Sequence, residues 1–528
     1  MLACLGLNEK EINKIKYLYI NPKTKIVING KESEYIKCEA GVRQGYPSSM
    51  VLFTIYIEGL LNLINNDNLI TPIYIPGVSK KIKYAAHADD INFFINDNVS
   101  LNRITLSLNK FCDTTGMKIN KNKSSIIKVY GHNNIDSLTF KVTNNKKILG
   151  IWYGKDKNKN NMKEMKSKLE KAIENWEKIW LYLPEHTIIV NKVLFAKIMY
   201  TLYTTNLDKK EIKIIEKLIF KYIWTKDFEP LKRGIMKNEI DQGGWRIWDV
   251  KTLEQALQLS NLINAILQKQ HPLEDLAIYI LGPITKHLSN ELTNRPFLLD
   301  NSNHYSQWRS TIKSLITTNI TIDKLKPSII YRSNHPQHHN PNLVDNSVEW
   351  KECWINVSRL PPEWKETTWR IINNVTMTKE YLHNYHLLRS AKCPRCTRDE
   401  STYHLFYECS TAYRTWTWFN NIFNITLNWK NIMYHSDFPS TNYNIYSLNW
   451  MVALIKRTIW KARCALLFEN KKWNPAVCIK KIKEEANLKI QNDIKLLTEK
   501  DFNQLYHGTF NVIWKEETTR YIFSDDWT

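Results

Sequence analysis

The chain has 528 residues, of which 43% are hydrophobic, so it can bury several hydrophobic cores and we expect three or four domains. Its formal net charge of +22 favours a polyanionic partner, most simply nucleic acid, although AT-rich codon usage would also enrich Lys, Asn and Ile. The nine cysteines are too few for a secreted disulfide scaffold, which indicates an intracellular protein.

The first forty residues predict two short strands around a turn. Residues 24–28 alternate in polarity, and the Asn29-Gly30 pair that follows is typical of a tight hairpin. Farther on, residues 81–95 predict strand, tight turn and strand, and residues 101–114 predict a helix.

Residues 50–64 are apolar nearly all round, which predicts a buried helix with Ser48 or Ser49 as its N-cap. The stretch is interrupted by Glu58 and falls short of the ~20 residues that a membrane span needs. We therefore expect a soluble protein with no membrane partner.

From about residue 160 the pattern becomes helical. Apolar residues at spacings of 4, 3, 4 and 3 predict an amphipathic helix over 169–183 that ends at Pro184. Residues 188–203 and 212–222 predict two further helices, and three such helices make a bundle. Residues 301–342 are polar and predict a boundary, with His335 and its neighbouring histidines as loop residues.

Two adjacent acids, Asp89 and Asp90, lie between the apolar runs of the predicted hairpin. Carboxylates at a rigid turn can ligate Mg²⁺, which prefers oxygen ligands, and a pair of such ions supports nucleotidyl transfer. Alone, the pair is weak support for a catalytic site, because Asp is common in turns for local hydrogen-bonding reasons.

Three other blocks accompany the acidic pair in a fixed order. G-V-R-Q-G-Y-P begins at Gly41, G-M-K-I-N-K-N-K-S at Gly116, and I-L-G-I-W at Ile148. Together with Y-A-A-H-A-D-D these blocks resemble the fingers and palm blocks of reverse transcriptases, such as G-V-R-Q-G-C-P and the Y-A-D-D box. The resemblance implies RNA-directed DNA polymerisation with two Mg²⁺ ions.

The resemblance also implies roles for particular residues. Asp89 and Asp90 should be the catalytic, Mg²⁺-ligating carboxylates. Gln44 and Gly45 should line the site where nucleotide and template meet, and Arg43 should contact template or phosphate. Lys123 should contact a phosphate, although an exposed, idle lysine is nearly as good an interpretation in this Lys-rich segment.

The sequence departs from the family pattern at two places. His87 replaces the aromatic Tyr of the Y-A-D-D box, and no Asp precedes Asp67, so the metal-binding Asp that the family carries on an earlier strand is missing. We therefore expect an N-terminally truncated or decayed copy that is inactive by itself. The alternative hypothesis is a non-catalytic nucleic-acid-binding protein derived from such an element.

The region after the palm blocks is dense in lysine, with seven Lys between 155 and 171. It leads to F-K-Y-I-W at Phe220, L-K-R at Leu231 and G-G-W-R-I-W-D at Gly243. This succession resembles the thumb of non-LTR (LINE-type) retrotransposon enzymes. A basic helical bundle of this kind can hold a duplex through its phosphates.

Cys393, Cys396, His404 and Cys409 form a C-x2-C-x7-H-x4-C pattern. Three thiolates and one imidazole suit tetrahedral Zn²⁺ in a structural site. The pattern resembles the zinc-binding segment of LINE-type enzymes, and the rival interpretation is a chance cluster of buried cysteines. His383 and His386 are lower-ranked substitutes as ligands.

The predicted fold class is α+β: a partial right-hand fingers and palm, then an all-helical thumb and a helical, zinc-bearing C-terminal region. The expected divisions are fingers and palm (1–155), thumb (156–250), helical region and linker (251–345), zinc segment (346–425) and helical tail (426–528). The resemblance implies an RNA template, a DNA primer or target and deoxynucleoside triphosphates as partners, in nucleus and cytoplasm.

Overall fold

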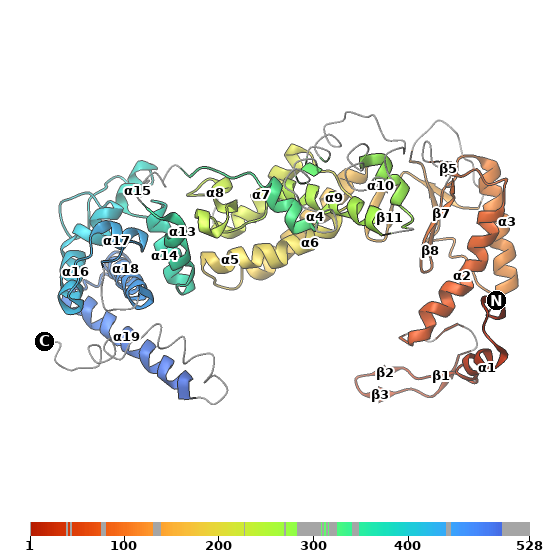
Figure 1. The fold of residues 1–528 in the computed structure, drawn as a ribbon, viewed down its shortest axis with the longest axis horizontal. Helices are drawn as coiled ribbons and strands as arrows, with labels where there is room; N and C mark the ends of the chain where they lie inside the picture. The colour runs from red at the N-terminus through yellow and green to blue at the C-terminus, as the bar shows by residue number, and fades with distance from the viewer. Residues whose placement is uncertain are drawn as a thin grey trace. The chain divides into compact units, whose positions relative to one another are not determined.

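The computed structural model describes residues 2–38, 41–42, 45–74, 81–129, 139–225, 228–268, 271–281, 308, 311–312, 315, 325–340, 348–439 and 445–498. These residues form a mixture of helices and two-stranded sheets (Figure 1). The chain divides into two compact units, residues 1–160 with 261–324, and residues 161–260 with 325–528.

The N-terminal segment of the first unit is a helix followed by a hairpin arm. Helix α1 (Glu9–Tyr17) begins at a capping box between Asn8 and Glu11. Strand β1 (Lys23–Thr24) pairs with β4 (Ile36–Lys37), and β2 (Val27–Ile28) pairs with β3 (Lys31–Glu32). Asn29 and Gly30 both have positive φ, 50° and 78°, as the predicted tight hairpin requires.

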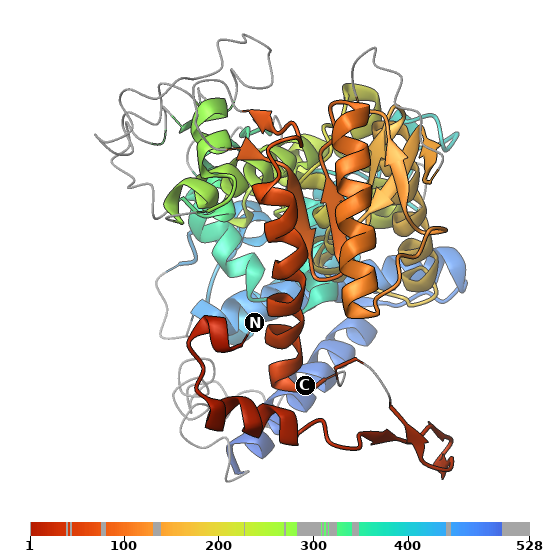
Figure 2. The same ribbon diagram turned by 90° about the vertical axis from the view of Figure 1, so that its right-hand side faces the viewer.

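Two long helices build the core of the first unit, α2 (Pro47–Asn66) and α3 (Asn98–Thr115), which lie side by side (Figure 2). The buried residues of this core are Ile57, Leu60, Leu61, Ile64, Ile70, Ile104 and Phe111. The prediction of Ser48 or Ser49 as N-cap is wrong: Tyr46 is the N-cap and Pro47 opens the helix. Proline suits that first position because its missing N–H would have no partner there.

The prediction that the apolar stretch is too short for a membrane span is also corrected. Helix α2 has 20 residues, and among the described helices it alone is long and apolar enough to cross a membrane, by length and composition only. In that window 28% of the residues are buried inside the protein. Core helices of water-soluble proteins meet the same criterion, so the finding is weak support for a span.

The strands of the first unit pair in twos. Strand β5 (Ile73–Tyr74) pairs with β6 (Lys81–Ile82), and β7 (Tyr84–His87) with β8 (Asp90–Phe93). Strand β9 (Ser125–Ile127) runs parallel to β10 (Lys141–Thr143), and β11 (Asn145–Ile148) forms a hairpin with β12 (Ile151–Gly154). Helix α10 (Glu274–Leu281) also belongs to this unit.

The second unit begins within α4 (Lys157–Trp176) and continues through helices up to residue 260. Its next elements are α5 (Leu183–Ile189), a π-helical turn (Val190–Leu194), α6 (Phe195–Leu202), α7 (Lys209–Trp224), α8 (Arg233–Lys237) and α9 (Val250–Leu267). Buried residues of α4 to α7 share one hydrophobic core, as expected for a bundle.

The prediction of one helix over 169–183 is wrong. Helix α4 ends at Trp176, Trp180 is 76% exposed in the connection, and Leu183 is the first residue of the next helix. Pro184 therefore begins a helix instead of ending one, because the first turn tolerates a residue without an N–H. The spacing of apolar residues continued across the break and concealed it.

The remaining helices of the second unit follow residue 325. They are α12 (Pro327–Asn334), α13 (Trp350–Ser358), α14 (Pro362–Ile372), α15 (Lys379–Asn384), a π-helical turn (His404–Glu408), α16 (Ser410–Phe423), α17 (Trp429–Tyr434), α18 (Ile445–Phe468) and α19 (Pro475–Thr498). A second core joins the cysteine-rich segment to α16, α18 and α19 through residues such as Phe406, Phe419 and Ile482.

Candidate carboxylate and zinc sites

The acidic pair lies at the end of a regular β-hairpin. Strands β7 and β8 pair antiparallel from Tyr84 opposite Phe93 to His87 opposite Asp90, so Ala88 and Asp89 form the two-residue turn. Ala88 has a left-handed φ of 51°, as such turns require. Asp89 and Asp90 are both exposed. The predicted strand, turn and strand are confirmed, and both carboxylates are accessible to a solvated cation.

The base of this hairpin is fixed to the C-terminal end of α2 by a buried lysine. The Nζ of Lys83 donates to the carbonyls of Ile64, Asn65 and Asp67 at 3.2, 2.9 and 2.7 Å. The side chain of Asp67 in turn accepts from Arg103 of α3 at 2.7 Å. A lysine that caps a helix C-terminus also interacts favourably with the helix dipole. Sequence analysis missed Lys83, because its partners are backbone carbonyls sixteen or more residues away.

The other residues assigned to this region are only partly described. Arg43 and Gln44 lie outside the described residues. Gly45 is exposed just before α2 and has a φ of 81°, a conformation in which a side chain is strained. Lys123 is exposed, and its carbonyl accepts from the Nζ of Lys146 at 2.9 Å.

The acidic pair does not assemble a larger ligand group. Among the residues that the structure describes, Asp89 and Asp90 belong to no group of three side chains whose ligand atoms lie within 4.8 Å of one another. Carboxylate oxygens suit Mg²⁺ as a donor type, but two of them leave most of its coordination shell to other groups.

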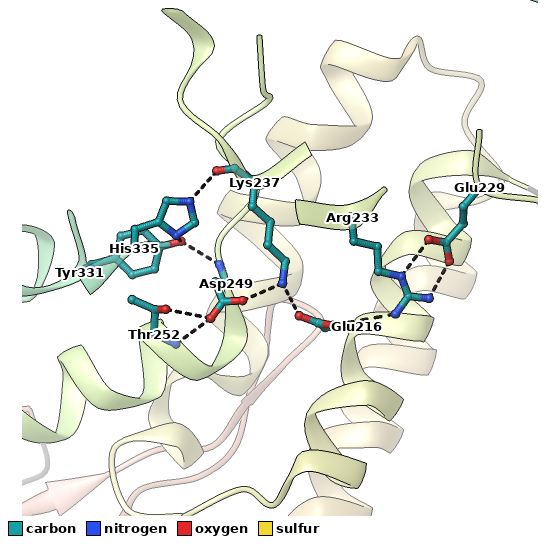
Figure 3. A network of polar contacts seen from close by, with 8 residues as sticks. All are labelled: Glu216, Glu229, Arg233, Lys237, Asp249, Thr252, Tyr331 and His335. Atoms are coloured by element: carbon teal, nitrogen blue, oxygen red, sulfur yellow. Dashed lines mark hydrogen bonds and ion pairs between the residues drawn. The ribbon is translucent and has the colours of Figure 1, made fainter. Parts of the chain in front are cut away.

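A buried ion network lies in the second unit (Figure 3). Lys237, whose side chain is 7% exposed, forms ion pairs with Glu216 and Asp249, the latter at 2.6 Å. Asp249 also accepts from the backbone N–H and hydroxyl of Thr252, both at 2.8 Å, and so caps the first turn of α9. The Asp of the G-G-W-R-I-W-D block is therefore a structural residue within this network.

The charges of this network stabilise each other. Burial alone would lower the pKa of Lys237, but Asp249 and Glu216 raise it above its usual value. Burial would likewise raise the pKa of Asp249, and Lys237 lowers it below its usual value. Arg233, of the L-K-R block, pairs with Glu229 at 2.6 Å. These blocks supply internal ion pairs, which sequence analysis did not foresee.

The histidine-containing segment after α12 completes the network. His335 contacts the Lys237 carbonyl at 3.0 Å through Nε2 and the Tyr331 hydroxyl at 3.2 Å through Nδ1. That hydroxyl accepts from the backbone N–H of Asp249 at 2.7 Å. His335 is outside any helix, as predicted, and its two nitrogens are used for packing contacts.

The cysteine-rich segment brings three of its four predicted ligands into one buried group. The ligand atoms of Cys393, His404 and Cys409 lie within 4.8 Å of one another. Cys396 adjoins them, with its Sγ 3.2 Å from the Nε2 of His404. Tetrahedral zinc with Zn–S near 2.3 Å and Zn–N near 2.1 Å separates its ligand atoms by about 3.6–3.8 Å. The group therefore needs only small shifts to hold Zn²⁺.

Local structure explains how these residues meet. Residues 392 and 399 form an antiparallel bridge, and the Cys393 N–H donates to the Arg398 carbonyl at 2.9 Å, so Cys393 and Cys396 lie in a tight turn. The π-helical turn carries His404, and Cys409 directly precedes α16. His383 and His386 are exposed and belong to no such group among the described residues.

The donor chemistry of the group fits a metal. The thiol of Cys393 shares a hydrogen bond with Cys409, which raises the pKa of Cys393 to about 12 and lowers that of Cys409 to about 7. One thiolate thus forms near neutral pH, and thiolate is the form that binds zinc. The Nδ1 of His404 is also buried without a hydrogen-bond partner in the protein.

Two comparisons with protein families agree with these sites. Residues 5–153 match the family described as "Reverse transcriptase (RNA-dependent DNA polymerase)", a range that includes the carboxylate hairpin. Residues 330–416 match the family described as "zinc-binding in reverse transcriptase", a range that includes all four predicted zinc ligands. Residues 5–153 are therefore similar to a reverse transcriptase domain, and residues 330–416 are similar to the zinc-binding segment of reverse transcriptases.

Proposed function

We propose that this chain is the polymerase portion of a non-LTR (LINE-type) retrotransposon protein and that its chemistry is RNA-directed DNA synthesis. The observation that carries the proposal is the β7–β8 hairpin, which presents Asp89 and Asp90 to solvent inside the matched reverse transcriptase region. The LINE-type assignment is supported by the G-G-W-R-I-W-D block and by the zinc-binding segment in one chain.

In this proposal Asp89 and Asp90 hold Mg²⁺ at the end of the hairpin. Bound there, the ions would activate the primer 3′-hydroxyl and stabilise the leaving pyrophosphate. Lys83 fixes the base of the hairpin, so the carboxylates have a defined position relative to α2. Arg43, Gln44 and Gly45, which precede α2, would line the nucleotide and template site.

The segment after α3 supplies positive charge for the sugar-phosphate backbone. Between residues 117 and 160 the chain has two Asp and ten Lys, namely Lys118, Lys121, Lys123, Lys128, Lys141, Lys146, Lys147, Lys155, Lys157 and Lys159. Lysines that neutralise phosphates bind nucleic acid independently of sequence, with an affinity that falls as salt rises. We propose this segment as the main nucleic-acid contact of the first unit, with Lys123 among its phosphate contacts.

We also propose that the carboxylate set of the catalytic centre is incomplete in this chain. No Asp precedes Asp67 in the sequence, and the described residues add no third ligand to Asp89 and Asp90. A two-metal centre that lacks a bridging ligand loses most of its metal affinity and rate. We therefore propose that the chain by itself binds primer–template but extends it poorly. We further propose that it acts inside the cell, in nucleus and cytoplasm.

Primer extension on an RNA template, with Mg²⁺ and with the Asp89→Asn variant as control, tests the proposal together with a binding titration at several salt concentrations. We expect salt-dependent binding without Asp89-dependent extension. Extension that requires Asp89 would establish polymerase activity, and it would refute the proposal that the carboxylate set is incomplete. If the chain neither binds nor extends the primer–template, the proposed function is refuted. Binding that is equally strong without the 117–160 lysines would refute the assigned contact.

A further inference from the structure

The histidine of the zinc group has a carboxylate beside its second nitrogen. Nε2 of His404 faces the Cys396 sulfur at 3.2 Å, and Nδ1 lies 3.6 Å from an Oε2 oxygen of Glu408. The π-helical turn places these two residues four positions apart. In metal sites the second ring nitrogen of a histidine ligand commonly donates to a carboxylate, which fixes the tautomer and the ring orientation.

Glu408 is itself held in place. Nη1 of Arg398 lies 3.5 Å from its Oε2 oxygen, and the Glu408 side chain is 33% exposed. A movement of a few tenths of an ångström closes the 3.6 Å separation to a hydrogen bond. His404 is 3% exposed, so its Nδ1–H has no access to bulk water as an alternative partner.

A second buried polar group belongs to the Cys-x-x-Cys turn, where the backbone N–H of Arg395 donates to the Cys393 sulfur at 3.5 Å. Nε and Nη2 of Arg395 are buried and have no hydrogen-bond partner within the protein. Buried guanidinium N–H groups without a hydrogen-bond partner are costly. A zinc centre with three thiolates and a neutral imidazole carries one net negative charge, which this cation would compensate.

We propose that Glu408 and Arg395 are positioning residues of the zinc centre. Glu408 accepts the Nδ1–H of His404 and holds Nε2 toward the metal, and Arg395 directs its buried N–H groups to the thiolate shell. The proposal rests on zinc binding by this group and is independent of polymerase activity. It assigns a partner to each of the two unsatisfied buried side chains in this segment, His404 and Arg395.

The test is the zinc affinity of the full chain, measured by competition with a chromophoric chelator. Glu408→Gln keeps the size of the side chain and removes its charge, and Arg395→Met keeps its length and removes its donors. Each should weaken zinc binding by about 10- to 100-fold. The matched controls Glu469→Gln and Arg389→Met change exposed residues of the same charge and should stay within about twofold of wild type.

Measurements on the zinc-free protein distinguish a role of Glu408 and Arg395 in positioning the zinc ligands from a general contribution to folding stability. Denaturant unfolding of the zinc-free chains should be alike for wild type and both variants, so the difference appears only with metal bound. Co²⁺-loaded variants should keep the thiolate charge-transfer bands of wild type. If both variants bind zinc within about twofold of wild type, the proposal is overturned. It is equally overturned if the zinc-free variants lose as much stability as the zinc-loaded ones.

If Arg395→Met does not fold at saturating zinc, Arg395→Lys decides its role. Lysine keeps the charge but not the planar fork of donors. A loss of at least about fivefold in zinc affinity supports the assignment, and an unchanged affinity overturns it for Arg395.

Discussion

The carboxylates of the buried ion network and those of the β7–β8 hairpin show opposite uses of acidic residues. Glu216 and Asp249 are each 15% exposed and share the ammonium of Lys237. Asp89 lies in the two-residue turn, Asp90 is the first residue of β8, and both are exposed. Buried charges must be neutralised within the fold, whereas exposed charges on a rigid turn remain available to a cation. The first pair therefore stabilises structure and the second pair is the candidate for chemistry.

The zinc group combines both properties, because it is buried and its donor atoms suit a metal ion. Cys393, His404 and Cys409 are at most 6% exposed, and two of them belong to the core that includes α16, α18 and α19. A further buried pair, Glu400 with Arg463 at 2.9 Å, ties the same segment to α18.

Removal of zinc should have the largest effect. We expect Cys393→Ser, or treatment with a chelator, to abolish the cooperative unfolding of the core around α16, because structural zinc contributes folding free energy directly. Metal analysis and tryptophan fluorescence during denaturation measure this. Cys4→Ser, at an exposed cysteine, is the control. An unchanged unfolding curve after complete zinc removal would contradict the prediction.

Loss of the central lysine of the network should come next. Lys237→Met leaves Glu216 and Asp249 buried without their cation, and breaking a buried pair in this way costs about 3–5 kcal/mol. Urea denaturation of the full chain measures the loss. The matched control is Lys232→Met, an exposed lysine just before α8, for which we expect a change below about 0.5 kcal/mol. Equal effects of the two substitutions would show that the network is not structural.

The pH dependence of the same network gives a smaller effect. Lys237 lowers the pKa of Asp249 below the ordinary value of 3.8, so the unfolded chain binds this proton first. The stabilisation is complete above pH 3.8 and is lost as pH falls through the lower folded pKa. The stability difference between wild type and Asp249→Asn should shrink over that acid range in denaturation series. A constant difference at all pH values would argue against the assigned pairing.

The smallest effect on stability is expected at the hairpin. Asp89→Asn changes an exposed turn residue and should alter the free energy of unfolding by less than about 0.5 kcal/mol. The same substitution should weaken Mn²⁺ binding near the hairpin, measured by paramagnetic relaxation, while exposed Asp399→Asn should not. A large loss of stability would mean that Asp89 has a structural partner like those of Asp249.

Local sequence was enough wherever neighbours along the chain decide the structure. Asn29-Gly30 adopts the predicted hairpin turn, and Asp89 lies in the predicted turn between two strands. The Cys-x-x-Cys turn likewise gathers its ligands with His404 as expected from spacing. The local pattern gave a wrong prediction at Trp180, because the apolar spacing continued across a break between two helices. It also gave a wrong N-cap at Ser48, because the helix already begins at Pro47.

The sequence by itself determined the composition of the sites: two adjacent acids in a turn, and three cysteines with a histidine at zinc-binding spacing. Only the tertiary structure decided which charged side chains form contacts within the protein. Lys83 donates to carbonyls of α2, Lys237 joins Glu216 to Asp249, and Glu408 faces His404. The strength of such interactions depends on burial and on the distance between the charges, and residue spacing in the sequence gives neither quantity.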